Sequence, residues 1–208
     1  GQEHLDVSGV DLSSKTEVEH LIDFLVNAQV AVVIADGCSI NDKGCAKIAE
    51  HLRKNETIKM LSMRNNKIGN SGAKSLAKAI KSNKVCTHID LLGNRSIGNK
   101  VMDTLCDAYL GSTTMVSICG IWPEKFAHSR ELSIDTLSPA DIKLISSELG
   151  KGKSDLISLD LSCHYGDIPD YETIIRALEY NTKLICLTCA NFKLDGQSET
   201  FIETFREA

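Results

Sequence analysis

The sequence predicts an α/β solenoid of parallel strands and helices, because two periodicities recur together along the chain. Within residues 58–85, Leu61 and Met63 alternate with polar residues, which is typical of a short strand. After a turn that contains Gly72, apolar residues recur at helical spacing through Ile80. A strand, a turn and an amphipathic helix therefore form one unit, which needs neighbours to bury both of its apolar faces.

The closest copy of this unit precedes it and matches it position by position. Val30, Val33, Ala35, Cys38, Ile40, Gly44, Ala49, Leu52 and Asn55 are in register with Ile58, Leu61, Met63, Asn66, Ile68, Gly72, Ala77, Ile80 and Asn83. The offset of about 28 residues lies within the range of leucine-rich repeats.

Each remaining unit again joins a short apolar strand to a helix. We expect strands at residues 4–8, 86–91, 116–119, 156–161 and 184–189, and helices at residues 16–26, 101–109, 139–151, 171–181 and 201–205. One helix has a clear start, because Ser138 suits the N-cap, Pro139 the first helical position and Asp141 the first turn. Leu194 is expected to be a turn residue. About seven repeats would make residues 1–208 a single elongated domain.

The repeated pattern resembles the leucine-rich repeats of the ribonuclease-inhibitor subclass. The matching residues are Ile58, Leu61, Met63, Asn66, Ile68, Gly72, Ala73, Leu76, Ala77, Ile80 and Asn83, with Cys38 in place of Asn in the preceding unit. The resemblance implies a horseshoe with parallel strands on the concave face and helices on the convex face. It also implies that the Asn or Cys side chain bonds the backbone of the turn. It leaves the function open, because one fold serves many functions.

Residues 94–130 carry a narrower likeness. The sequence IGNKVMDTL at 97–105, the strand after it and an extension with aromatic, proline and basic residues are similar to the C-terminal repeat domain of tropomodulins. Tropomodulins cap actin filaments, so this resemblance implies a role in the actin cytoskeleton.

The composition predicts a globular cytoplasmic protein. Hydrophobic residues make up 42% and charged residues 25% of the chain, as in ordinary globular proteins. No segment approaches the roughly 20 apolar residues of a membrane span, and no secretory signal is present, so we expect no membrane partner. A net charge of −5 without a basic stripe argues against nucleic acid. Because the chain begins with Gly1, we expect the natural protein to be longer.

The eight cysteines do not predict a disulfide framework or a metal site. Disulfide frameworks are typical of small secreted chains. Cys186 and Cys189 form a C-x-x-C pair near Cys163 and His164, but thiols spaced in this way on one strand diverge. Structural zinc sites generally pair two such motifs on turns. We predict reduced thiols, no metal and no cofactor. No cysteine has a histidine placed to activate it, so we predict that the protein is not an enzyme.

The candidate site is the strand surface that faces away from the helices. Candidate partner-binding residues are Asp36, Met60, Arg64, His88, Asp90, Leu92, Cys119, Ile121, Trp122, Phe126 and Asp160. Small or apolar side chains rimmed by acids are typical of an interaction surface. The alternative is that short side chains merely fit a tight inner radius. We expect His88 and Asp90 to be two solvated side chains and not a catalytic pair, because no nucleophile accompanies them.

Residues 122–133 are expected to be an insertion in the fifth unit. They contain the single tryptophan, Trp122, together with Pro123, Phe126, His128 and Arg130, residue types that favour interface anchors. Long loops in compact repeats are often functional, so we predict one wall of a binding surface here. The equally weighted alternative is that Trp122 and Phe126 cover the edge of the core.

Together these features predict a non-catalytic scaffold that binds another protein through its concave face and the Trp122 insertion. The alternative is a regulator of a small GTPase, similar to the GTPase-activating proteins built on such repeats. Terminal repeats have an outer edge that needs a cap or a neighbour. We therefore also expect self-association through the terminal repeats around Leu5 and Leu187, or further sequence beyond them.

Overall fold

The computed structural model describes residues 4–120, 131–133, 138–153, 155–161, 168–189 and 192–195. The chain divides into two compact units, residues 1–120 (unit 1) and 121–208 (unit 2), and each is described by itself. The single elongated domain expected from the sequence stays a prediction. No helix among the described residues is long and apolar enough to cross a membrane.

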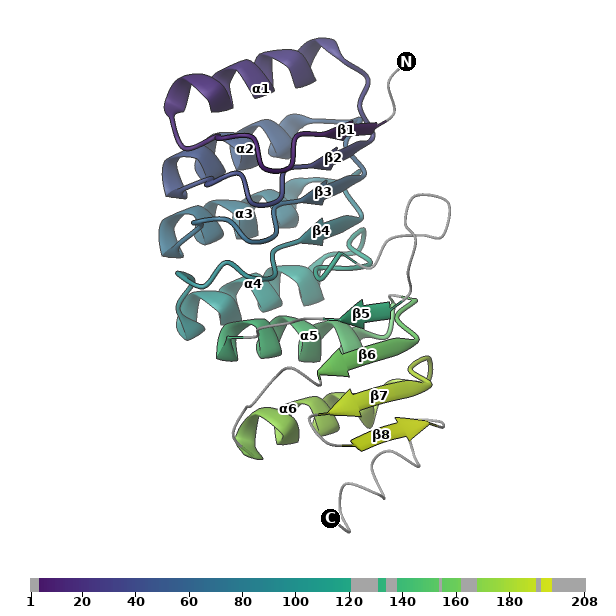
Figure 1. Ribbon diagram of the computed structural model, residues 1–208. Helices are drawn as coiled ribbons and strands as arrows, with labels where there is room; N and C mark the ends of the chain where they lie inside the picture. Colours follow the sequence, from purple (N-terminus) through teal and green to yellow (C-terminus); the bar gives the residue numbers. More distant parts are fainter. Residues whose placement is uncertain are drawn as a thin grey trace. The chain divides into compact units, whose positions relative to one another are not determined.

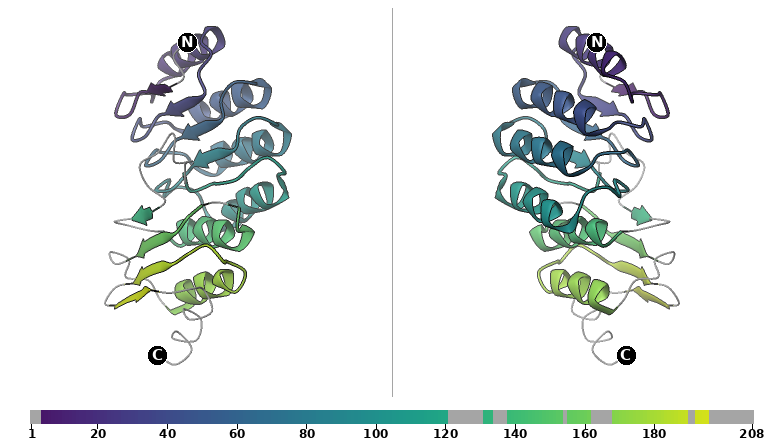
Figure 2. Two further views of the ribbon diagram at one scale, coloured as in Figure 1. Left: turned by 90° about the vertical axis from the view of Figure 1, so that its right-hand side faces the viewer. Right: turned by 90° about the vertical axis from the view of Figure 1, so that its left-hand side faces the viewer.

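Unit 1 alternates strand and helix (Figure 1). Its elements are β1 (His4–Asp6), α1 (Lys15–Asn27), β2 (Val32–Ile34), α2 (Asp42–Lys54), β3 (Met60–Ser62), α3 (Asn70–Ser82), β4 (His88–Asp90) and α4 (Asn99–Gly111). The strands form a parallel sheet in the order β1-β2-β3-β4. Helices α1 to α4 all lie on one side of this sheet (Figure 2). The prediction of parallel strands, each followed by a helix, is confirmed for this unit.

The strand register reproduces the predicted repeat. Leu5 pairs with Val33, Val33 with Leu61, and Leu61 with Ile89, so that each step along the sheet advances one repeat. Val33, Leu61 and Ile89 are buried. Leu5 on the edge strand is only half-buried. The core is therefore a ribbon shared between neighbouring repeats, and it is completed only where a repeat has neighbours on both sides.

The turn after each strand is held by a side chain from the repeat pattern. Asn66 Oδ1 accepts a hydrogen bond from the Ile40 N–H at 2.9 Å, and Asn66 Nδ2 donates to the carbonyls of Ala35 at 2.8 Å and Arg64 at 3.2 Å. Asn66 is buried. It therefore satisfies backbone groups of the preceding repeat that water cannot reach, where an unsatisfied group would be costly.

The same role recurs at the equivalent positions of the neighbouring repeats. Asn94 accepts from the Ile68 N–H at 3.2 Å and donates to the Met63 carbonyl at 2.9 Å. The Cys38 thiol donates to the Val7 carbonyl at 3.1 Å. The expectation that Asn or Cys bonds the turn backbone is thereby confirmed.

Unit 2 contains helices α5 (Pro139–Lys151) and α6 (Ile168–Leu178) and strands β5 (Glu131–Ser133), β6 (Ser158–Leu161), β7 (Cys186–Cys189) and β8 (Phe192–Asp195). Strands β5, β6 and β7 are parallel, whereas β8 is antiparallel to β7. The expectation that Leu194 is a turn residue is wrong, because it lies in β8 and pairs with Leu187. So few residues separate β7 from β8 that an antiparallel pairing is possible but a parallel crossover is not.

Helix α5 begins where the sequence predicted. The Ser138 side chain accepts a hydrogen bond from the Asp141 N–H at 3.2 Å, and the Asp141 carboxylate accepts one from the Ser138 N–H at 2.9 Å. The helix ends at Lys151, and the next residue, Gly152, has a φ of 61°, the left-handed conformation that glycine favours. Helix α6 begins at Ile168, slightly earlier than expected. The helix expected at residues 201–205 lies outside the described residues.

The fifth repeat departs from the prediction. Residues 116–119 form no regular strand, and only isolated bridges join Ser117 to His88 and Cys119 to Asp90. Strand β5 instead lies inside the expected insertion of residues 122–133 and pairs with β6. This long repeat thus supplies one extended segment to unit 1 and another to unit 2. Gly120, with a φ of 70°, turns the chain directly after the first segment.

Candidate functional site

On the sheet face of unit 1 that points away from the helices, side chains are exposed to solvent at β1 and buried at β3 and β4. On β1, His4 and Asp6 are exposed. The matching side chains further along the sheet are buried, with exposed fractions of 1% for Met60, 3% for Ser62, 5% for His88 and 3% for Asp90. The expectation that Met60, His88 and Asp90 face an open hollow is therefore wrong. His88 and Asp90 are also not the solvated pair that the sequence suggested.

The backbone at Gly120 accounts for part of this closure. A Cβ atom at Gly120 would fall 2.5 Å from Asp90 Oδ2, so the chain lies directly against this carboxylate. Leu92 and Cys119, also expected to face a partner, are buried as well. Asp36 and Arg64 remain half-buried. Of the predicted site residues in unit 1, these two are the ones whose side chains reach solvent.

Four polar side chains from β2 to β4 and the residues just after these strands bind one another, and we call them the polar brace: Asp36, Ser62, Arg64 and Asp90. Asp36 Oδ1 accepts hydrogen bonds from the Ser62 hydroxyl and, at 2.9 Å, from the Arg64 N–H. The Arg64 guanidinium binds Asp90 Oδ2 through Nε at 2.9 Å and through Nη2 at 2.8 Å. The structure thus brings together Asp36, Arg64 and Asp90, and it adds Ser62, which the sequence reasoning did not select.

The polar brace is electrostatically coupled. Burial raises the pKa of Asp90 to about 7, while the Arg64 charge and the hydrogen bond from the Leu92 N–H oppose this rise. Arg64 places its guanidinium against a carboxylate that is almost wholly removed from water. Removing one partner of such a pair is strongly destabilising, because the other is left buried without compensation. The brace therefore fixes the strand ends, and the Arg64 guanidinium is already engaged with Asp90.

Three predicted residues, Ile121, Trp122 and Phe126, lie outside the described residues, and their role in binding stays a prediction. In unit 2, Asp160 lies in β6, between Ser133 of β5 and Thr188 of β7 in the register. Its side chain is half-buried, and its contact with a partner also stays a prediction.

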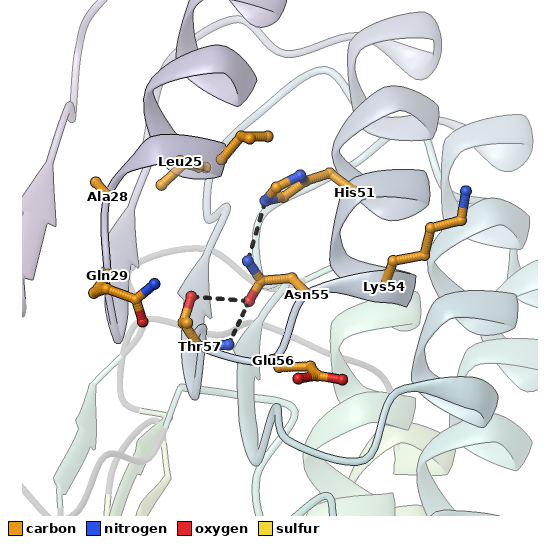
Figure 3. Close-up of a pocket in the computed structure, with 9 residues that line it drawn as sticks. Leu25, Ala28, Gln29, His51, Lys54, Asn55, Glu56 and Thr57 are labelled. Carbon is orange, nitrogen blue, oxygen red and sulfur yellow. Dashed lines mark hydrogen bonds between the residues drawn. The ribbon is translucent and has the colours of Figure 1, made fainter.

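A pocket that the sequence did not predict lies between the C-terminal ends of α1 and α2 (Figure 3). Its volume is about 340 Å³, and its lining residues are Leu25, Val26, Ala28, Gln29, His51, Lys54, Asn55, Glu56 and Thr57. Helix α1 and the residues after it contribute mainly apolar side chains. Helix α2 and the turn that follows it contribute the polar ones.

At this pocket, the asparagine side chain at the end of the repeat makes a different hydrogen bond from its equivalent in the next repeat. In the next repeat, Asn83 Nδ2 donates to the Leu52 carbonyl at 2.6 Å and so caps the preceding helix. At the equivalent position, Asn55 Nδ2 lies 3.2 Å from His51 Nε2 instead, as the dashed line in Figure 3 shows. Ala79 stands where His51 would be in the next repeat. The signal in the sequence is therefore a histidine four residues before the repeated asparagine.

The chemistry of the pocket suits recognition. Burial lowers the pKa of His51, so its ring is neutral at pH 7 and can accept a hydrogen bond. Asn55 Oδ1 accepts hydrogen bonds from the Thr57 N–H at 2.9 Å and from the Thr57 hydroxyl at 3.2 Å. These contacts order the polar wall and leave an apolar wall opposite, which is the usual character of a site that holds a side chain or small ligand.

Among the described residues, six cysteines form no disulfide bond: Cys38, Cys45, Cys86, Cys106, Cys119 and Cys186. Burial raises the pKa of Cys45, and it raises the pKa of Cys86 to about 12, so neither is a thiolate at neutral pH. Within the described ranges, no group of at least three potential metal ligands comes together. Cys163 and His164 lie outside these ranges, so the prediction of reduced, metal-free protein stays a prediction for the whole chain.

Comparison with known proteins identifies the fold. The C-terminal domain of tropomodulin from Caenorhabditis elegans aligns with 99% of this chain and 89% of that chain, with a TM-score of 0.51 and 10% sequence identity. The shared fold is leucine-rich-repeat-like. A structure described as leiomodin-1 actin-binding site 2 aligns with 54% of this chain and 68% of that chain, with a TM-score of 0.46 and 22% identity. No protein-family model and no curated protein matches the sequence.

Proposed function

We propose that this protein is a non-catalytic, cytoplasmic interaction module of the ribonuclease-inhibitor-like class of leucine-rich repeats, and that it binds another protein. The observation that carries the proposal is the polar brace. The Arg64 guanidinium pairs with Asp90, and Asp36 accepts hydrogen bonds from the Ser62 hydroxyl and the Arg64 backbone N–H, across neighbouring strands. Such a surface has a fixed shape before a partner arrives, which lowers the ordering cost of binding.

The proposed contact surface is the accessible part of the sheet face together with the segment of residues 122–133. On the sheet face it comprises exposed Asp6 and half-buried Asp36 and Arg64. In the segment, Trp122 and Phe126 are residue types that carry much of the binding energy at interfaces. Aromatic residues and arginine are enriched at protein interfaces.

We further propose that the partner belongs to the actin cytoskeleton. The support is the likeness of residues 94–130 to tropomodulins and the repeat fold shared with a tropomodulin domain over nearly the whole chain. Fold alone does not assign a partner, so actin is the first partner to test. Regulation of a small GTPase is the alternative. It would need a polar group free to act on a nucleotide, whereas Arg64 is engaged with Asp90.

The test of the contact surface compares two aromatic substitutions. Trp122→Ala is the test variant, and Tyr180→Ala, at a side chain that is 74% exposed in unit 2, is the matched control. An exposed anchor at Trp122 predicts that partner binding is lost while the free energy of unfolding stays within about 1 kcal/mol of wild type. A loss of about 3–5 kcal/mol would identify Trp122 as a core residue. That result would refute the binding role of this segment.

The test of the partner class uses the purified chain as bait in a cytoskeletal extract, with bound proteins identified by mass spectrometry. Retention of actin or an actin-associated protein by wild type and Tyr180→Ala, but not by Trp122→Ala, is the expected result. Stimulated GTP hydrolysis by a small GTPase without a stable complex would support the alternative instead.

A further inference from the structure

The asparagine that follows α3 has a carboxamide with two separate tasks. Asn83 Oδ1 accepts hydrogen bonds from the N–H groups of Val85 at 2.8 Å and Cys86 at 2.6 Å, which orders the turn before the next strand. Its Nδ2 donates backwards, to the carbonyls of Leu52 at 2.6 Å and Asn55 at 3.0 Å at the C-terminal end of α2. We call this backward hydrogen bond from Nδ2 the latch, because it ties the end of one helix to the repeat after it.

Unit 2 contains the same arrangement. Asn181 Oδ1 accepts a hydrogen bond from the Leu184 N–H at 2.8 Å, and Asn181 Nδ2 donates to the Leu149 carbonyl of α5 at 3.0 Å. Both latching asparagines have an alanine four residues earlier, Ala79 before Asn83 and Ala177 before Asn181. Alanine has no side-chain acceptor, so Nδ2 is left to the carbonyls of the preceding helix.

At Asn55, which follows α2, the first task is kept and the second is not. Asn55 Oδ1 accepts hydrogen bonds from the N–H groups of Thr57 at 2.9 Å and Ile58 at 2.6 Å. Its Nδ2 contacts His51 Nε2, four residues earlier (Figure 3), and among the described residues it makes no hydrogen bond to α1. The latch is therefore open between α1 and α2, and the pocket of about 340 Å³ lies at this place.

The contact between Asn55 and His51 depends on the protonation of the ring. His51 Nε2 accepts an N–H from Asn55 only while it carries no proton of its own. The carboxamide does not adapt to a protonated ring by turning over, because Oδ1 would then lose its hydrogen bonds from Thr57 and Ile58. Protonation of His51 therefore breaks the contact and releases Nδ2 of Asn55.

The charges around the ring keep it neutral at pH 7. The nearest charged side chains come from α2, from α1 and from the turn after α2: Lys47 with its partner Glu19, Lys54 with its partner Glu50, and Glu56. Both lysines are thus engaged in ion pairs, and α1 contributes no charged residue to the pocket lining. Burial lowers the pKa of His51. The ring therefore gains its proton on the acid side of the ordinary histidine range.

We propose that His51 and Asn55 form a pH-sensitive latch between the first two repeats. While the ring is neutral, it holds Nδ2 of Asn55 and the latch is open. When the ring is protonated, Nδ2 passes to the carbonyls of Phe24 and Asn27 at the end of α1. These two residues stand one repeat before Leu52 and Asn55, whose carbonyls accept the closed latch from the next repeat. Closing draws the end of α1 onto the second repeat and fills the pocket. The latch goes beyond the proposed function and does not depend on the partner.

A pH titration followed by nuclear magnetic resonance tests the latch in the wild-type chain. The ring signals of His51 report its protonation, and the side-chain Nδ2 signals of Asn55 report the hydrogen bond. The Asn55 signals and the backbone amides of residues 24–28 should shift in step with the protonation of His51. In His20→Ala, which removes an exposed histidine of α1, the same titration should persist and serves as the matched control.

The variant His51→Ala installs the residue type that precedes the two closed latches. Its Asn55 signals should no longer titrate and should keep, at every pH, the position that wild type reaches in acid. Amide hydrogen exchange in the last turn of α1 should slow at least about threefold relative to wild type at pH 7, because the closed latch opposes local opening.

Three results would overturn the proposal. One is a wild type whose Asn55 signals stay fixed while His51 titrates. Another is unchanged exchange in the last turn of α1 in His51→Ala, because the ring would then not be what holds the latch open. The third is loss of the Asn55 titration in His20→Ala, which would assign the effect to a different histidine.

Discussion

Replacing Asn66 by Ala should destabilise unit 1 strongly, although it removes few atoms. Asn66 is 7% exposed and makes three hydrogen bonds to backbone groups. The substitution leaves the Ile40 N–H and the Ala35 carbonyl buried without their partner. Each such group costs about 1–3 kcal/mol, so we expect a loss of about 2–5 kcal/mol in the free energy of unfolding. Urea denaturation followed by far-UV circular dichroism measures this loss.

Two control variants separate the loss of these buried hydrogen bonds from the general effect of replacing an asparagine. Asn66→Cys installs the side chain that the preceding repeat uses at Cys38, whose thiol donates to the Val7 carbonyl. It keeps the donor but loses the acceptor for Ile40, so its loss should be smaller than that of Asn66→Ala. Asn27→Ala removes an exposed side chain that bonds only to the Asp23 carbonyl of its own helix and should stay within about 0.5 kcal/mol. The reasoning fails if Asn66→Ala is as mild as Asn27→Ala.

Three further outcomes are expected. Gly120→Ala should destabilise the protein more than Gly9→Ala in the same denaturation assay. Both glycines have positive φ, but only the Cβ at residue 120 would meet a neighbour, at 2.5 Å from Asp90. Equal losses in the free energy of unfolding would argue against the close contact. Because burial raises the pKa of Asp90 from 3.8 to about 7, its contribution to stability should be complete below about pH 4 and lost as the pH rises through about 7. The unfolding free energy of wild type minus that of Asp90→Asn should therefore fall across this window, and a constant difference would contradict the raised pKa. Intact mass and metal analysis of the purified protein should show reduced thiols and no stoichiometric zinc; a mass deficit matching disulfides, or bound zinc, would refute that prediction.

The parts of the fold that the sequence predicted are those set by local periodicity. Leu61 and its equivalents identify the strands because a period of two and a spacing of about 28 residues both point to them. Ser138 and Asp141 identify a helix start because capping depends on residues close in sequence. The role of Asn66 follows from the repeat, since the same side chain meets the same backbone groups each time.

The parts that the sequence missed depend on contacts between distant segments. Alternation along a strand indicates that Met60 and His88 point away from the helices, but it does not show whether that side is open, and both are buried. The strand β5 has no repeat signal of its own and is defined by pairing with β6. The pocket between α1 and α2 is lined by residues from separate repeats, and at Asn55, one of them, the side chain contacts His51 instead of capping the preceding helix.

Co-sedimentation with actin filaments tests the proposed function most directly. The chain is mixed with increasing amounts of filamentous actin, and its fraction in the pellet is measured for wild type, Trp122→Ala and Tyr180→Ala. The proposal predicts saturable binding of wild type and Tyr180→Ala, with little of Trp122→Ala in the pellet. Wild-type protein that remains in the supernatant at every actin concentration would contradict binding to actin filaments.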